Sequence, residues 1–136
     1  MIFEINQTYE EEFCVSEETY NGSIQLFQDK NPLHTDEAFA VSMGFKGKVM
    51  HGNILNGFIS YFVGECLPAK NVIIHTQEIQ FKNPVYLNDI LHFKACVTGI
   101  FESVNAVEFK FEFCKPLELN KYKVVAKGKF QIGILQ

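Results

Sequence analysis

The strongest constraint on this chain is the change of hydrophobic period at Pro68. Before it, apolar residues recur at spacings of three and four, which predicts a helix. They are Ile54, Leu55, Phe58, Ile59, Phe62 and Val63. Proline ends that helix because it lacks a backbone donor. Beyond Pro68 the apolar residues alternate at period two, which is typical of strands. The chain therefore predicts one apolar helix followed by antiparallel strands.

The remaining boundaries follow from capping residues and alternation. Strands are expected over residues 7–15, 72–81, 90–100, 104–114 and 122–134, and helices over 17–27, 36–43 and from near 52. Ser16 is the expected N-cap of the first helix, and Thr35 a possible cap of the second. This order excludes a doubly wound parallel sheet. It predicts a single α+β domain over 1–136, with a curved antiparallel sheet wrapped around the central helix.

Charge narrows the class of partner. The formal net charge of −4 argues against nucleic acid, which is bound by basic surfaces. The lysines near the C-terminus, at 121, 123, 127 and 129, alternate in two pairs. That spacing indicates the solvent face of a strand, with contact to a phosphate-bearing ligand as the alternative. No nucleic-acid partner is expected.

Cysteine usage and hydropathy bear on the compartment. None of Cys14, Cys66, Cys96 and Cys114 forms a C-x-x-C pair, and each is expected to be a buried free thiol. The first residues, Met-Ile-Phe-Glu, carry no basic stretch, so a reducing cytoplasm is expected. The apolar run 54–67 is too short and too polar to span a membrane.

Two groups suited to proton transfer lie five residues apart, Asp29 and His34, with Pro32 stiffening the loop between them. A carboxylate and an imidazole held close together can bind one water and exchange protons with it. The alternative is structural, because Asp and Asn beside proline commonly form turns. Spacing alone leaves both interpretations open.

His51-Gly52 lies at the start of the central helix. Free N–H groups and the positive end of the dipole gather there, and glycine permits close approach of a ligand oxygen. Such a position can stabilise an enolate or thioester oxyanion. Relief of crowding at the turn is the alternative for Gly52. For Ser60, two turns further, the alternative is a bond back to a carbonyl one turn earlier.

Together these residues resemble the MaoC-like dehydratase family, most closely its short single-domain (R)-specific enoyl-CoA hydratases. The matching stretches are Asp-Lys-Asn-Pro-Leu-His-Thr-Asp at 29–36, Phe45, Val-Met-His-Gly at 49–52, and Phe-Lys-Asn-Pro-Val-Tyr-Leu-Asn-Asp at 81–89. The resemblance implies a hot-dog fold and a homodimer or higher homo-oligomer, with the substrate tunnel near the subunit interface. It implies that Asp29 and His34 are catalytic. Substrate binding falls on Asn31, which shapes the loop, on His51, on the Gly52 amide and on Ser60.

The implied reaction is reversible hydration of a trans-2-enoyl thioester to an (R)-3-hydroxyacyl thioester, so a hydro-lyase is expected. It needs no metal or redox cofactor, and coenzyme A or an acyl-carrier thioester enters as part of the substrate. The alternatives are a dehydratase acting on a carrier-bound or specialised biosynthetic intermediate, and a non-catalytic subunit that binds acyl thioesters. A thioesterase is a further alternative.

The chain departs from the family pattern at two turns. Phe27-Gln28 stands where a small pair, often Ser-Gly, is usual, and these larger side chains are expected to narrow or reshape the pocket. Asn88-Asp89 stands where Gly-Asp is usual. Asparagine tolerates left-handed dihedrals, so the second turn is expected to survive.

Overall fold

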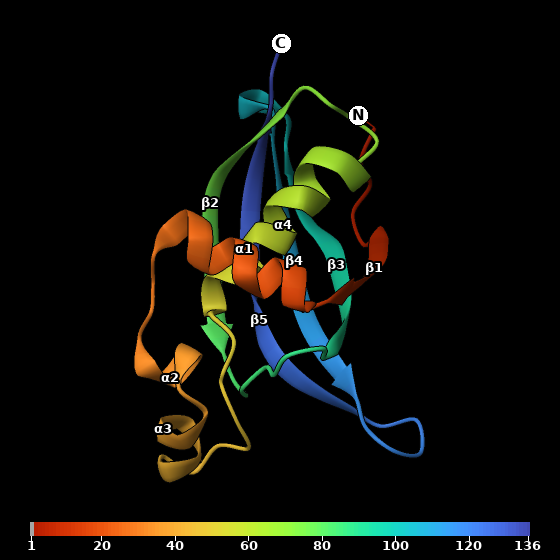
Figure 1. The fold of residues 1–136 in the computed structure, drawn as a ribbon. Helices are drawn as coiled ribbons and strands as arrows, with labels where there is room; N and C mark the ends of the chain where they lie inside the picture. Colours follow the sequence, from red (N-terminus) through yellow and green to blue (C-terminus); the bar gives the residue numbers. More distant parts are fainter. Residues whose placement is uncertain (1) are drawn as a thin grey trace.

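One antiparallel sheet of five strands curves around helix α4 (Gly52–Tyr61) in a computed structural model that describes residues 2–136 (Figure 1). The spatial order is β1-β3-β4-β5-β2. The strands are β1 (Thr8–Cys14), β2 (Val72–Phe81), β3 (Ile90–Phe101), β4 (Ala106–Pro116) and β5 (Tyr122–Ile134). This confirms the α+β class predicted from the helix-then-strand order, and the hot-dog fold that the family resemblance implies.

Phenylalanine fills the space between the helix and the sheet. On β3 and β4, inward residues are opposite one another in the register, as Phe93 is to Phe113 and Val97 to Phe109. From the helical side, Phe62 lies with its ring centroid 4.9 Å from that of Phe93. Each such side chain contributes roughly 1.5–3 kcal/mol when fully buried. The period change at Pro68 therefore separates the two layers that share this core.

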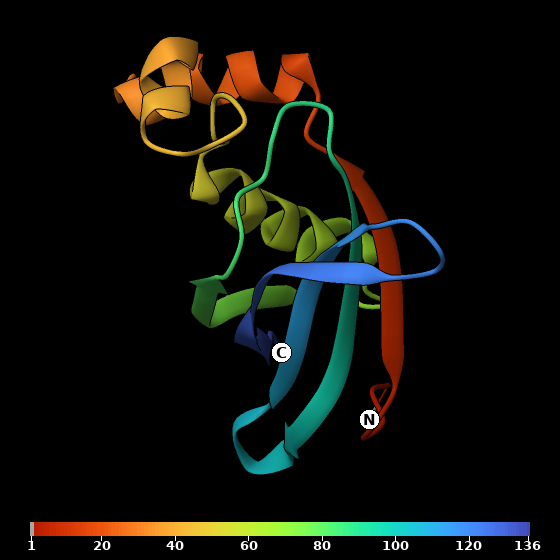
Figure 2. The same ribbon diagram turned by 90° about the horizontal axis from the view of Figure 1, so that it is seen from below.

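Three short helices gather at the end of the molecule where α4 begins (Figure 2). They are α1 (Glu17–Phe27), α2 (Pro32–Thr35) and α3 (Glu37–Ser42). Ser16 caps α1 as predicted, accepting from the Thr19 amide. The predicted cap Thr35 is wrong, because it lies inside α2 and Asp36 caps α3 instead. A π-helical turn, η1 (Phe62–Cys66), continues α4 toward Pro68.

Of the other local predictions, one is confirmed and two are wrong. Asn88 adopts the left-handed conformation expected of it, with φ of 69°. The strand predicted from residue 104 begins instead at Ala106, because Glu102–Val104 form a 3-10 turn. The four cysteines are free, but Cys14 is exposed, so its predicted burial is wrong. Cys14 is the last residue of β1, an edge strand that pairs only with β3. Among the described residues, no helix is both long and apolar enough to cross a membrane.

Candidate active site

The loop between α1 and α2 is held by its own side chains. Gln28 ends α1 in the left-handed region, with φ of 61°. The Asp29 carboxylate accepts from the Asn31 amide at 3.2 Å, and the Asn31 side chain accepts from the Leu33 amide at 2.9 Å. Asparagine therefore works here as the cap of α2, whose first residue is proline, a favoured position for it. Asn31 shapes the loop through this cap.

His34 is fixed in one tautomer. Its Nδ1 lies 2.7 Å from the Val49 carbonyl oxygen. A carbonyl can only accept, so Nδ1 carries a proton, and in the neutral ring Nε2 presents a lone pair. The backbone of the same residue is also held, because the Tyr20 hydroxyl donates to the His34 carbonyl at 2.5 Å.

The free Nε2 of His34 faces Asp29. It lies 4.0 Å from Oδ2 of that carboxylate, and the His34 side chain is 17% exposed against 54% for Asp29. Neither acceptor can donate to the other when His34 is neutral. A water that donates to two acceptors at about 2.8 Å each holds them roughly 4.4 Å apart. The observed separation therefore suits one bridging water.

His51 lies behind this pair, and it is the one polar side chain in the buried core of the described residues, 5% exposed. Its ring stacks on that of His34, with centroids 4.0 Å apart and planes at 27°. Its Nε2 lies 2.8 Å from the Asp29 carbonyl oxygen. The sequence placed His51 among the substrate-binding residues. In the structure it lines the hollow described below, but its hydrogen bond is made to the loop between α1 and α2.

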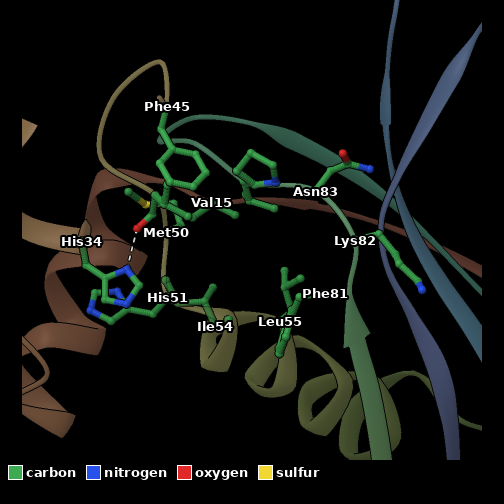
Figure 3. A pocket seen from close by; sticks show the side chains of 14 residues that line it. Val15, His34, Phe45, Met50, His51, Ile54, Leu55, Phe81, Lys82 and Asn83 are labelled. Atoms are coloured by element: carbon green, nitrogen blue, oxygen red, sulfur yellow. Dashed lines mark hydrogen bonds between the residues drawn. The ribbon is translucent and has the colours of Figure 1, made fainter. Parts of the chain in front are cut away.

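A hollow of about 410 Å³ opens beside these groups, between the start of α4 and the segment that follows β2. Figure 3 shows the two imidazole rings at one end, with Phe81 and Lys82 at the other. Apolar side chains form most of its wall, including those of Phe45, Leu55 and Val85. Its volume falls within the ordinary range for sites that bind small ligands. The hollow offers an apolar chain a place to lie with one end near His34.

Gly52 lines the hollow at the first position of α4. Its amide has no acceptor among residues 2–136, as expected for the first turn of a helix. A Cβ at this position would lie 2.7 Å from the Phe81 ring. Glycine thus lets that ring pack closely against the helix terminus, and a larger residue would displace the ring.

Four predicted residues do not line the hollow. Two of them, Asp29 and Asn31, belong to the loop beside His34. Ser60 is on the exposed face of α4 and does not line it. Phe27 is 66% exposed and does not line it either. The expectation that Phe27-Gln28 narrows the pocket is therefore wrong for the single chain. Gln28 instead takes the left-handed cap position, which explains why a glycine is usual there.

Asp29, His34 and His51 each place one possible ligand atom within 4.8 Å of the others. Two imidazoles and a carboxylate are a ligand set that transition metals use. One nitrogen of each ring is already bonded to a backbone carbonyl, His34 Nδ1 to Val49 and His51 Nε2 to Asp29.

Sequence reasoning missed two supports of this site. The Val49 carbonyl sets the tautomer of His34, and the Tyr20 hydroxyl holds its backbone. Both contacts join segments more than ten residues apart, where period and spacing give no signal. Val49 does fall in the stretch 49–52 that carries the family resemblance, which was the available signal.

The chain is similar in sequence to a known domain family and to two curated enzymes. Residues 8–119 match the model of the MaoC like domain. The chain is 35% identical over 85 residues to an (R)-specific enoyl-CoA hydratase of Rhodospirillum rubrum, covering 62% of this chain and 59% of that protein. It is 38% identical over 77 residues to an (R)-specific enoyl-CoA hydratase of Aeromonas caviae, covering 57% and 58%. The matches thus span less than two thirds of these curated relatives.

The fold has solved counterparts. The structure of an (R)-hydratase from A. caviae involved in PHA biosynthesis superposes with a TM-score of 0.85. The two chains are 24% identical in that superposition, which covers 97% of each. At this identity the likeness concerns the fold, and the arrangement of sheet and central helix described above is the shared feature.

Proposed function

Because the chain belongs to the MaoC-like domain family, we propose that it catalyses the reversible hydration of a trans-2-enoyl thioester to an (R)-3-hydroxyacyl thioester. The observation that carries this proposal is the separation of 4.0 Å between Asp29 Oδ2 and His34 Nε2, where His34 is the member of the pair that lines the apolar hollow. Two acceptors at this distance suit a water that is bound by both. The names of the two hydratase relatives support the same reaction class.

In the proposed reaction one water lies between Asp29 and His34. Its oxygen bonds to C3 of the enoyl chain, the C2–C3 π bond opens, and a proton is delivered to C2. The proton that the water loses is taken up by the pair, so atoms and charge balance over the cycle. We assign the acid and base roles to the pair together, because both groups would contact the same water.

The Gly52 amide would take the charge that develops on the thioester oxygen. It lies at a helix N-terminus, where the dipole favours negative charge, and it has no acceptor within the described chain. Donors aimed at developing charge are usually the largest electrostatic contribution to such reactions. We propose that no metal or redox cofactor takes part, because a carboxylate and an imidazole can by themselves bind one water and exchange protons with it.

The test is hydration of crotonyl-CoA followed by loss of the enoyl thioester absorbance, with chiral analysis of the product. Asp29→Asn and His34→Gln are each expected to lower kcat by about 10²–10⁴, the range for loss of general acid–base catalysis. A matched control exists on the sheet, where His92 Nε2 lies 3.2 Å from Glu10 Oε1 outside the hollow. Glu10→Gln and His92→Gln should keep wild-type kcat.

Wild-type turnover in either Asp29→Asn or His34→Gln would refute the assignment. Binding of the enoyl thioester with no hydration would favour the non-catalytic alternative. Release of free thiol would identify a thioesterase. Comparing crotonyl-CoA with the same acyl group on an acyl carrier protein would separate the two dehydratase alternatives.

We also propose that the chain forms a homodimer through α4 and β2. Strand β2 lies at an edge of the sheet, and its Ile73 is 49% exposed. Asn56 of α4 accepts from Gln77 of β2, and Ser60, one turn further along the helix, is exposed. A partner covering this face would bury Ser60, whose family role is in the pocket. Light scattering coupled to gel filtration should give twice the mass of the chain, and a monomer at assay concentration would refute it.

A further inference from the structure

We infer that His51 is a positioning residue of the Asp29–His34 pair, acting through the backbone of Asp29 and the ring of His34. This inference rests on the proposed function, because the pair it positions is the proposed water site. Three contacts converge on the imidazole. They involve the Asp29 carbonyl oxygen at 2.8 Å, the His34 ring at 4.0 Å and the Tyr20 ring at 6.0 Å.

The hydrogen bond from His51 holds the backbone carbonyl of Asp29 in place. Because a carbonyl oxygen only accepts, Nε2 of His51 carries the proton and donates it. The Asp29 side chain is 54% exposed and has one backbone contact of its own, to Asn31. Without the bond from His51, the peptide carbonyl of Asp29 would be free to turn. The carboxylate would then lose its fixed position opposite His34 Nε2.

The stacking contact with His51 holds the ring of His34, the second member of the pair. The His34 ring has one hydrogen bond, through Nδ1 to Val49, and rotation about that bond would swing Nε2 away from Asp29. The His51 face, 4.0 Å from the His34 centroid and nearly parallel to it, opposes that rotation. One buried side chain therefore sets both the carboxylate and the imidazole.

Stability alone does not explain an imidazole at this position. With Nε2 protonated, Nδ1 is an acceptor, and it is buried with no partner among the described residues. A buried polar atom without a partner destabilises the fold. Phenylalanine would fill the same space and stack on His34 without that penalty. The retained donor at Nε2 is what phenylalanine would lack, so the hydrogen bond to Asp29 is the feature that requires histidine.

Two variants separate the donor from the packing. His51→Phe keeps an aromatic face toward His34 and removes the donor. His51→Gln keeps an N–H group near the position of Nε2 and removes the ring. We expect His51→Phe to fold with an unchanged or raised Tm and to lose about 100-fold in kcat with crotonyl-CoA, because small misplacements of reacting groups have effects of this size. KM should stay within about threefold, since the apolar wall is intact.

His51→Gln should recover at least about tenfold of the kcat lost in His51→Phe, the value of one regained hydrogen bond. The inference is overturned if folded His51→Phe keeps wild-type kcat. It is also overturned if KM rises while kcat is kept, or if His51→Gln is no better than His51→Phe. A residue that merely fills space would give the reverse order, with phenylalanine the better replacement.

A measurement on the wild-type chain needs no turnover, and it uses a variant only to assign the signals. Imidazole ¹⁵N shifts report which nitrogen carries the proton, and the His51 signals are assigned by their loss in His51→Gln, or by residue-specific labelling if that variant does not fold. We expect His51 as the Nε2–H tautomer and His34 as the Nδ1–H tautomer. An Nδ1–H tautomer at His51 would overturn the inference. Absence of hydration by the wild-type protein would refute the proposed function instead, and the tautomer measurement would still decide the role of His51.

Discussion

Replacing Gly52 by proline removes one hydrogen atom that the proposed reaction needs. Gly52 is the first residue of α4, where proline is well tolerated because that N–H has no partner within the helix. His51 already has φ of −62° and ψ of 132°, the extended conformation that a following proline requires. Gly52→Pro should therefore fold, with its helix intact and the proposed oxyanion donor missing.

The magnitude follows from two separable effects. Any side chain at this position meets Phe81, because a Cβ would lie 2.7 Å from that ring, and ordinary contact begins at 3.4 Å. The ring must move by about 0.7 Å, which its 54% exposure allows. Gly52→Ala carries this effect alone and retains the N–H. Gly52→Pro adds the loss of the donor, which typically lowers kcat by about 10²–10³, or roughly 2.7–4 kcal/mol.

The assay compares kcat and Tm of Gly52→Ala and Gly52→Pro with crotonyl-CoA as substrate. We expect a kcat ratio between the two variants of about 100 or more, with Tm values close together. Equal kcat in two folded variants would refute the role of the Gly52 amide. A much lower Tm in Gly52→Pro alone would show instead that Gly52 is not the first residue of α4.

Further predictions concern stability and thiol reactivity. Gly128→Ala should destabilise the fold by about 3 kcal/mol or more, as severe overpacking does, because its Cβ would lie 2.0 Å from the Glu78 backbone oxygen. In the control Gly22→Ala the added Cβ meets nothing within 4 Å. That control should stabilise α1 by about 0.5–1 kcal/mol. Urea denaturation measures both changes in stability. An unfolding midpoint of Gly128→Ala equal to that of the wild type would contradict the close contact with Glu78. Burial, together with Glu11, raises the pKa of the Cys66 thiol to about 11. Only the thiolate reacts, so iodoacetamide at pH 8 should modify the exposed Cys14 well before Cys66. The rate of modification at Cys66 should rise as the pH approaches 11. Mass spectrometry of the peptides gives the order of modification, and Cys66 reacting first at pH 8 would contradict the prediction.

Much of the architecture could be predicted from local signals. The helix that begins at Gly52 and the strands after Pro68 followed from hydrophobic period, and Ser16 followed from its capping chemistry. Helix α2 was missed although Asn31-Pro32 carries both a cap and a proline at the first helical position. Four residues are too few to show a hydrophobic period, so only the capping signal could have revealed it.

The site was predicted less completely than the fold. Asp29 and His34 were singled out from spacing and resemblance, and the structure brings their side chains within 4.0 Å. The contacts of His51 could not be predicted, because they join the start of α4 to a loop 22 residues earlier. Burial decides its role, and burial at a helix terminus depends on how separate elements pack. The same limit applies to Phe27, whose exposure depends on the path of α1.

Asp29 and His34 are proposed to act on the same water, and a double-mutant cycle measures whether they do. The measurements are kcat values for crotonyl-CoA hydration by the wild type, Asp29→Asn, His34→Gln and the double variant. If the two residues hold one water, the second substitution removes little that the first has not removed, and the losses are strongly non-additive. We predict a double-variant kcat within about tenfold of the weaker single variant. Losses that multiply in the double variant would contradict a shared water.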